Sequence, residues 1–142
     1  MVSHEHVVSV RWGQCDPAGI VFYPRFFEWF DQSTEALFTV VGLPWPALFA
    51  TYRVSGVSIV EAGARFTAPV RYGDGARIRS TIVEVRDKTF RVEHEVSVNG
   101  ARCATGFEMR AWIALPDTPG GRLRSAPFPA EVAARLKGEA RP

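Results

Sequence analysis

The sequence predicts an α+β domain in which a curved antiparallel sheet wraps around one long, apolar helix. The helix is indicated by an aromatic-rich pattern of helical period over residues 24–42. The sheet is indicated by a first strand near the N-terminus and by four strand patterns that follow one another over residues 54–115. A helix that is apolar around much of its circumference must be covered on several sides, and a curved sheet can do this.

The N-terminal part contains a strand, a tight turn and the start of the helix. Residues 6–12 alternate loosely between apolar and polar and are expected to form the first strand. The tetrapeptide Asp16-Pro17-Ala18-Gly19 is typical of a tight turn. Pro24 suits the first turn of a helix, and Gly42, followed by Pro44, is expected to end it. A turn therefore holds Asp16 between a short strand and the helix.

The helix is expected to bury one broad face. Its members are Phe26, Phe30, Ser33, Leu37 and Val41, flanked by Phe27, Trp29, Phe38 and Val40, with Glu28, Gln32 and Glu35 on the opposite side. Asp31 falls at the border between the two faces, next to Phe27 and Phe38.

The remaining pattern is mostly strand. A short helix is expected at 45–51, strands at 54–69, 76–86, 90–98 and 102–115, and a last short helix at 129–137. The strands are expected to pair consecutively as a meander, with open sheet edges that are suited to pairing with another subunit. In strand 102–115 the alternation predicts one face made of Cys103, Thr105, Phe107, Met109, Ala111, Ile113 and Leu115.

Length and composition indicate one domain over residues 1–142, with 46% apolar residues. The net charge of +2 is too small to indicate nucleic-acid binding, and no apolar run is long enough to span a membrane. The two cysteines do not make a disulfide framework, and the N-terminus lacks a secretory pattern. We expect a cytoplasmic protein.

Asp16 is the first candidate for catalysis. A carboxylate near the start of a helix lies beside free backbone N–H groups, which can polarise a carbonyl oxygen. Trp12, Phe22 and Trp29 could provide apolar walls around it. The alternative is that Asp16 only forms the turn. Together, a carboxylate and free N–H groups are the minimum needed to hydrolyse an activated acyl bond.

Two further acidic residues are candidates for binding a substrate. Asp31 could accept a hydrogen bond from a hydroxyl group deep in an acyl pocket, or could simply be solvated or paired with an arginine. Glu61 lies on a strand of small and β-branched residues and could equally face solvent. Arg86 and Lys88, at a predicted hairpin tip, could clamp a phosphate group or serve solubility alone.

Other chemistries are disfavoured. The histidine spacing does not suit a metal site, and His94 is best interpreted as a core histidine with hydrogen-bond partners. The sequence contains no nucleophile elbow, no phosphate-binding glycine loop and no dinucleotide fingerprint.

Residues 13–24, Gly-Gln-Cys-Asp-Pro-Ala-Gly-Ile-Val-Phe-Tyr-Pro, resemble the Asp-Pro-Ala-Gly-Ile-Val-aromatic-Tyr-Pro motif of hotdog-fold acyl-CoA thioesterases, in the Pseudomonas-type 4-hydroxybenzoyl-CoA branch. The likeness continues through Trp29-Phe30-Asp31, Gly42-Leu43-Pro44, Val85-Arg86-Asp87-Lys88-Thr89-Phe90 and Arg122-Leu123-Arg124. It therefore covers essentially the whole domain in order.

The resemblance implies a role for each matching position. Asp16 matches the catalytic carboxylate, and Tyr23 matches the residue whose backbone N–H binds the thioester oxygen. Asp31 matches the acidic residue that meets a ring hydroxyl. Arg86 and Lys88 match positions of a basic triplet that holds a phosphate of coenzyme A. The resemblance also implies a homotetramer, with active sites at subunit interfaces and no cofactor beyond the coenzyme A of the substrate.

The chain departs from this branch at two places. Asp87 stands where the branch has a second arginine, and the residues around Glu61, which would line the acyl pocket of a neighbouring subunit, also differ. The expected activity is hydrolysis of an aromatic acyl-CoA. The alternatives are a thioesterase for short or branched aliphatic acyl-CoA or acyl-carrier-protein substrates, and a non-catalytic acyl-CoA-binding module.

Overall fold

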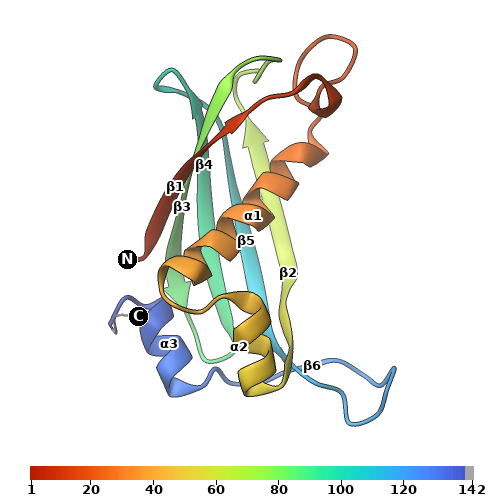
Figure 1. Cartoon of the computed structure of the whole chain (residues 1–142), viewed down its shortest axis with the longest axis vertical. Helices are drawn as coiled ribbons and strands as arrows, with labels where there is room; N and C mark the ends of the chain where they lie inside the picture. The colour runs from red at the N-terminus through yellow and green to blue at the C-terminus, as the bar shows by residue number, and fades with distance from the viewer. Residues whose placement is uncertain (140–142) are drawn as a thin grey trace.

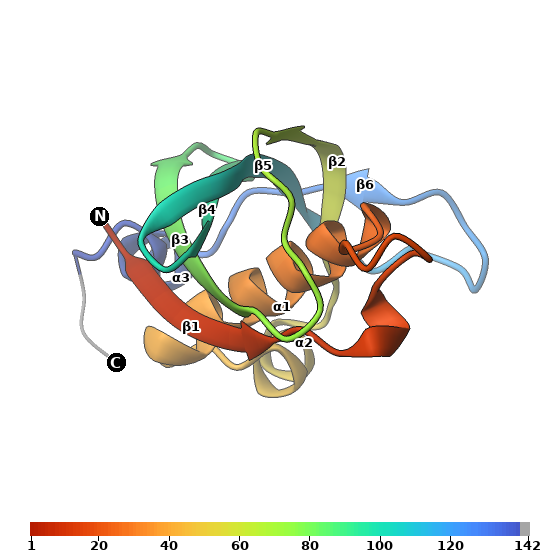
Figure 2. The same ribbon diagram turned by 90° about the horizontal axis from the view of Figure 1, so that it is seen from above.

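One antiparallel sheet curls around a single long helix in the computed structural model, which describes residues 1–139 (Figures 1 and 2). The strands are β1 (Ser3–Ser9), β2 (Val54–Phe66), β3 (Gly75–Val85), β4 (Thr89–Val98), β5 (Ala101–Ala114) and the short β6 (Arg124–Ser125). The helices are the 3₁₀ turn η1 (Trp12–Gln14), α1 (Pro24–Val40), α2 (Trp45–Tyr52) and α3 (Ala130–Leu136). The predicted α+β class and the curved sheet around a central helix are confirmed.

The long helix begins and ends where the sequence predicts. Pro24 is its first residue, with Tyr23 at the N-cap, and the chain leaves it through Gly42 at a φ of 79°. A positive φ favours glycine because a side chain would strain the backbone there. The first strand, however, ends earlier than residue 12. The side chain of Gln14 accepts a hydrogen bond from the N–H of Arg11 at 3.0 Å and starts the 3₁₀ turn instead.

The predicted meander is wrong for β2. The strand order is β1-β3-β4-β5-β2, so β2 pairs with β5 at the edge opposite β1. Residues 67–74 cross from β2 at one edge to β3, which lies next to β1, and pass the N-terminal end of α1 (yellow-green in Figure 2). They form hydrogen bonds with the turn before α1, from Val21 N–H to Val70 O at 2.8 Å and from Tyr72 N–H to Gly19 O at 3.0 Å. This crossover lets the sheet enclose the helix.

The face of β5 that the alternation predicts forms one row of the strand, and the alternate row is the one that faces α1. The side chains that meet α1 are those of Glu108 and Arg110, and Trp112 packs in the core next to them. Gly106 faces the ring of Phe30 in the same row. Two charged residues in one row usually mark the solvent side of a strand, but here that row faces the helix, and the row of the apolar Phe107 and Met109 does not. They lie on the outer row and are partly covered.

The core follows α1 along its length. At its C-terminal half, Leu37 and Phe38 pack with residues of β4 and β5, and at its N-terminal half, Phe26 and Phe30 pack with residues of β3 and β4. Among the helices of residues 1–139, none combines the length and the apolar character that crossing a membrane requires.

Candidate active site

Asp16 lies in the turn before α1 and lines an open pocket of about 520 Å³. Its carboxylate oxygen Oδ1 accepts the N–H of Ala18 at 2.8 Å, and its backbone oxygen accepts the N–H of Gly19 at 2.9 Å. These bonds fix the turn and the direction of the side chain. The residue is half-buried, and Oδ2 has no bonding partner among residues 1–139. One carboxylate oxygen is therefore held in place and the other is available to a ligand.

Tyr23 lines the same pocket at the N-cap of α1. The N–H groups of Phe22 and Phe26, on either side of it, are bonded to Gln14 O at 2.9 Å and to Tyr23 O at 3.2 Å. The N–H of Tyr23 has no protein acceptor within the described part of the chain. A free donor at the positive end of a helix dipole can bind a developing negative charge on oxygen. The structure therefore brings the two predicted catalytic positions together.

Aromatic side chains wall the pocket, but not all of those predicted do so. Phe22, Phe26 and Phe66 line it, and the rings of Phe26 and Phe66 meet edge to face at 5.0 Å. Trp29 is only 1% exposed and packs against Phe26 at 5.1 Å inside the core. The expectation that Trp29 contacts the substrate is therefore not supported, because its position on α1 turns it toward the sheet. Trp12 is exposed and does not line the pocket.

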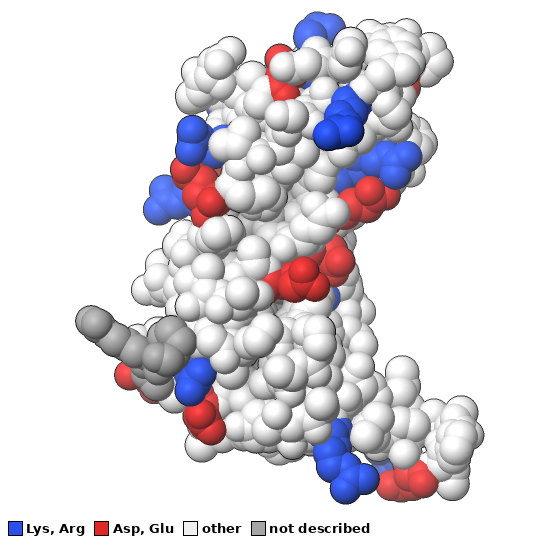
Figure 3. All heavy atoms as spheres, in the orientation of Figure 1, with Lys and Arg blue, Asp and Glu red and all other residues white. Residues whose placement is uncertain are grey.

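Asp31 lies two turns along α1 from Tyr23, and Figure 3 shows acidic side chains on the face of the molecule where α1 and β2 lie. Its side chain is 54% exposed, and Oδ1 accepts a hydrogen bond from Nη2 of Arg110 at 2.6 Å. The prediction left open whether Asp31 is paired with an arginine, and it is. The pairing uses one oxygen, and the carboxylate remains accessible.

Behind Asp31, a buried polar cluster crosses the core. Oε1 of Glu108 accepts the hydroxyl of Thr34 and lies 3.0 Å from Nε2 of His94, whose Nδ1 lies 2.6 Å from the Ser80 hydroxyl. Oε2 of Glu108 accepts Nη2 of Arg110 at 2.6 Å. The prediction that His94 is a core histidine with hydrogen-bond partners is confirmed.

Glu108 is ionised in this cluster. Burial by itself raises the pKa of Glu108, but the hydrogen bond from His94, the charge of Arg110 and the hydrogen bond from Thr34 outweigh it and hold the pKa below its ordinary value. The sequence did not identify Glu108 or Arg110. The available signal was two charged residues, two positions apart, within a long apolar strand.

The other predicted binding residues lie elsewhere. Glu61 is exposed on β2, at a bulge in the edge strand. Arg86 and Lys88 follow the end of β3, whereas Asp16 lies near its start, and an eleven-residue strand is about 36 Å long. The hairpin instead adjoins the segment before α3, where Phe128 N–H donates to Asp87 O at 2.9 Å. Arg86 and Lys88 are thus not brought to Asp16 within one protomer.

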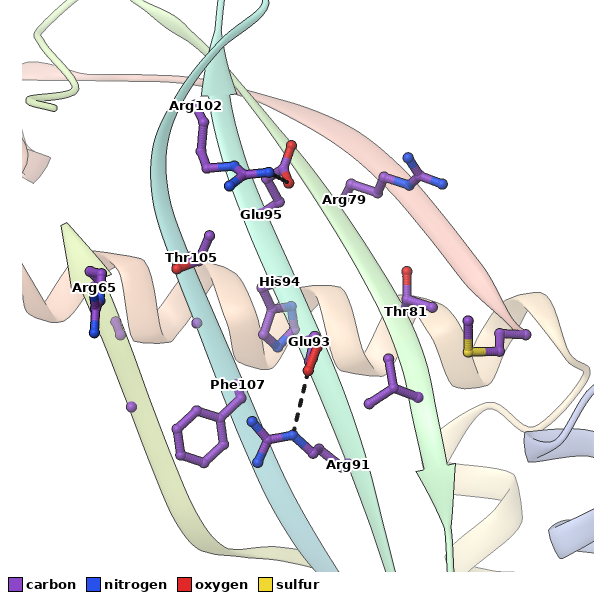
Figure 4. Close-up of a pocket in the computed structure, with 15 residues that line it drawn as sticks. Arg65, Arg79, Thr81, Arg91, Glu93, His94, Glu95, Arg102, Thr105 and Phe107 are labelled. Atoms are coloured by element: carbon purple, nitrogen blue, oxygen red, sulfur yellow. Dashed lines mark ion pairs between the residues drawn. The ribbon is translucent and has the colours of Figure 1, made fainter. Parts of the chain in front are cut away.

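A larger hollow, of about 750 Å³, lies on the outer face of the sheet, with α1 passing behind the strands (Figure 4). None of the predicted site residues lines it. Its carboxylates are paired with arginines, Glu93 with Arg91 at 3.7 Å and Glu95 with Arg102 at 3.1 Å. Because these carboxylates are engaged, we do not assign the catalytic chemistry to this face. Within residues 1–139 no three His, Cys, Asp or Glu side chains gather as a metal site would require.

Comparison with known proteins agrees with this geometry. The family model of the thioesterase-like superfamily matches residues 10–136, which include the pocket, α1 and the whole of β2 to β5. The chain belongs to the thioesterase-like superfamily. This assignment also agrees with the hotdog-fold resemblance of residues 13–24.

Relatives of this superfamily member include aromatic acyl-CoA thioesterases. The chain is 34% identical over 127 residues to the 4-hydroxybenzoyl-CoA thioesterase of Pseudomonas sp. (strain CBS-3), covering 86% of this chain and 89% of that protein. An Asp-to-Asn variant of 4-hydroxybenzoyl-CoA thioesterase, complexed with 4-hydroxybenzoyl-CoA, matches with a TM-score of 0.87 at 29% identity, covering 96% of this chain and 99% of that one. A gentisyl-coenzyme A thioesterase matches with a TM-score of 0.78 at 33% identity, covering 91% and 98%.

Proposed function

We propose that this protein hydrolyses the thioester of an aromatic, hydroxybenzoyl-like acyl-CoA to the free acid and coenzyme A. The observation that carries the proposal is the pocket that Asp16 shares with the unbonded N–H of Tyr23. A carboxylate and an oxyanion-binding donor on one cleft are what an acyl transfer to water requires.

In the proposed reaction, the N–H of Tyr23 binds the thioester oxygen and stabilises the charge that develops on it. Asp16 then acts by one of two routes. As a nucleophile, it forms a bond from its carboxylate oxygen to the carbonyl carbon while the carbon–sulfur bond breaks, and water hydrolyses the resulting anhydride. As a general base, it takes a proton from water while the hydroxide adds to the carbon and the thiolate leaves. Single-turnover hydrolysis in ¹⁸O-labelled water distinguishes them, because only the nucleophilic route can put label into Asp16.

The aromatic acyl group is supported by three observations. The relatives named above act on, or bind, hydroxylated aromatic acyl-CoA thioesters. The pocket wall of Phe22, Phe26 and Phe66 suits an aromatic ring. Asp31 presents an accessible carboxylate farther along α1, and we propose that it accepts the hydrogen bond of the ring hydroxyl.

The remaining expectations concern assembly. We propose a homotetramer in which Arg86 and Lys88 hold a phosphate of coenzyme A at the active site of another protomer, and Glu61 of β2 lines its acyl pocket. The distance from the hairpin to Asp16 in one protomer and the exposed edge of β2 support this arrangement.

We propose that no metal or organic cofactor takes part. Because coenzyme A thioesters are intracellular metabolites, we propose a cytoplasmic site of action.

The decisive test is the release of free thiol from a panel of acyl-CoA substrates by the wild type and the Asp16→Asn variant. Loss of the carboxylate should lower kcat at least about a hundredfold while acyl-CoA binding is retained. Asp74→Asn is the matched control, because Asp74 also accepts a backbone N–H in a turn, that of Arg71 at 2.8 Å, but does not line the pocket. Undiminished turnover in Asp16→Asn would refute the assignment, and binding without thiol release by the wild type would indicate an acyl-CoA-binding module.

A further inference from the structure

Arg110 connects the core of the protein to the surface at Asp31. Its side chain is 5% exposed, and it leaves β5 on the same row as Glu108. Nη2 donates to Glu108 Oε2 and to Asp31 Oδ1, both at 2.6 Å, and Nη1 donates to Val57 O at 3.0 Å. One guanidinium therefore joins β5, β2 and α1.

The position of this guanidinium is fixed on several sides. The carboxylate of Glu108 is itself bound by Thr34 and His94, and the guanidinium carbon of Arg110 lies 5.4 Å from the ring centre of Trp45. A planar guanidinium whose two terminal nitrogens donate in different directions has little rotational freedom. The guanidinium of Arg110, fixed inside the core, therefore holds Oδ1 of Asp31 in place.

The guanidinium of Arg110 binds only one of the two carboxylate oxygens of Asp31. Oδ2 has no partner within residues 1–139, and the side chain is 54% exposed. Asp31 comes eight residues after Tyr23, which corresponds to about 12 Å along the helix axis. That separation suits a para-substituted benzoyl group with one hydrogen bond at each end. Phe27, one turn before Asp31, lies on the same side of the helix.

We propose that Arg110 is a positioning residue that gives the enzyme its preference for an acyl group with a hydroxyl on the ring carbon farthest from the thioester. It holds Oδ1 of the Asp31 carboxylate so that the free oxygen, Oδ2, is turned to accept this hydroxyl. The inference rests on the proposed function and deepens it by naming what orients the acyl end of the site. The bond from Nη2 to Asp31 extends the buried Glu108–Arg110 pair to an exposed residue, and through it the core fixes a group at the surface.

The test compares kcat/KM for 4-hydroxybenzoyl-CoA and benzoyl-CoA in Arg110→Lys and in the double variant Glu108→Gln/Arg110→Met. Lysine keeps the positive charge but lacks the planar guanidinium that can donate to two carboxylates at once. The double variant removes both buried charges together, a change that proteins often tolerate. Glu28→Gln is the control, because it breaks an exposed ion pair of α1, with Arg25 at 2.8 Å, away from Asp31. Thermal unfolding reports whether each variant is folded.

The expected result is that the preference for the hydroxylated substrate falls about tenfold or more, the size of a lost hydrogen bond to a charged group. Turnover of benzoyl-CoA should stay within about twofold of the wild type. An equal loss on both substrates would overturn the proposal, because it would show a structural role only. An unchanged preference in folded Arg110 variants, where Asp31→Asn abolishes it, would overturn the role of Arg110 but not that of Asp31. A wild type without thioesterase activity would instead refute the proposed function.

Discussion

Glu108 and His94 lie side by side in the core, on neighbouring strands, with Oε1 of the carboxylate 3.0 Å from Nε2 of the imidazole. The side chains are 2% and 0% exposed. Both ring nitrogens of His94 have a partner when the Ser80 hydroxyl donates to Nδ1 and the Nε2–H donates to Glu108. The ring of Phe30 stacks on His94 at 4.4 Å. A polar cluster thus lies directly beneath the helix that carries the candidate site.

Glu108→Gln should lower the free energy of unfolding by about 3 kcal/mol at pH 7, because it leaves Arg110 without its buried partner. The pKa of Glu108 in the folded protein lies below its ordinary value of 4.5. The stability that it provides is therefore complete above pH 4.5 and is lost as the pH falls through the folded pKa. Urea unfolding between pH 7 and pH 3 should show the difference between wild type and variant shrinking in acid.

Glu93→Gln is the control for this measurement. Glu93 lies on β4 with its side chain 51% exposed and pairs with Arg91 at 3.7 Å. An exposed pair of this kind contributes less than about 1 kcal/mol. A difference between wild type and Glu108→Gln that stays constant from pH 7 to pH 3 would show that Glu108 is not an ionised partner.

Gly106→Ala should destabilise the fold by about 1–3 kcal/mol, because the added methyl group would overlap the buried ring of Phe30. Phe30 cannot move away, since it is fully buried against His94. Gly75→Ala, also in a strand, is the control, as its methyl group would make an ordinary contact of 3.6 Å with Val7. Thermal unfolding of both variants checks the prediction, and equal melting temperatures would contradict it.

Arg86→Ala and Lys88→Ala should each raise KM for acyl-CoA about threefold to tenfold with little change in kcat, if the hairpin clamps a phosphate. The acyl-pantetheine ester, which lacks the nucleotide, should show no change in KM. Arg79→Ala, on the outer sheet face, is the control for loss of positive charge. An equal rise in KM for acyl-CoA and for the acyl-pantetheine ester would show that the hairpin does not bind the nucleotide.

Val60→Lys should disrupt subunit pairing through β2 and lower activity with it. Val60 is 60% exposed on this edge strand, and an added charge on an edge opposes pairing with another chain. Light scattering after size-exclusion chromatography measures the mass. Val7→Lys, 55% exposed on β1 at the opposite edge, is the control. A mass equal to that of the wild type would exclude β2 as the pairing edge.

The sequence by itself determined the local elements and the main candidates for catalysis. The bounds of α1 followed from Pro24 and Gly42, whose backbone preferences act within a few residues. The turn at Asp16 and free N–H groups at the start of the helix were predictable for the same reason, because both depend on the chain immediately around that start. The choice of Tyr23 as the donor was implied by the resemblance of residues 13–24. The core role of His94 followed from its place on the apolar side of a strand.

Tertiary structure alone decided what depends on contacts between distant residues. It placed β2 beside β5, because residues 67–74 bond to the turn before α1 rather than forming a hairpin. It placed Trp29 in the core and placed Glu108 and Arg110 beneath α1. There the carboxylate and the guanidinium bond to each other, so β5 does not have to expose them to solvent. Local patterns rank charged residues as exposed; only the packed sheet and helix show which of them have partners inside.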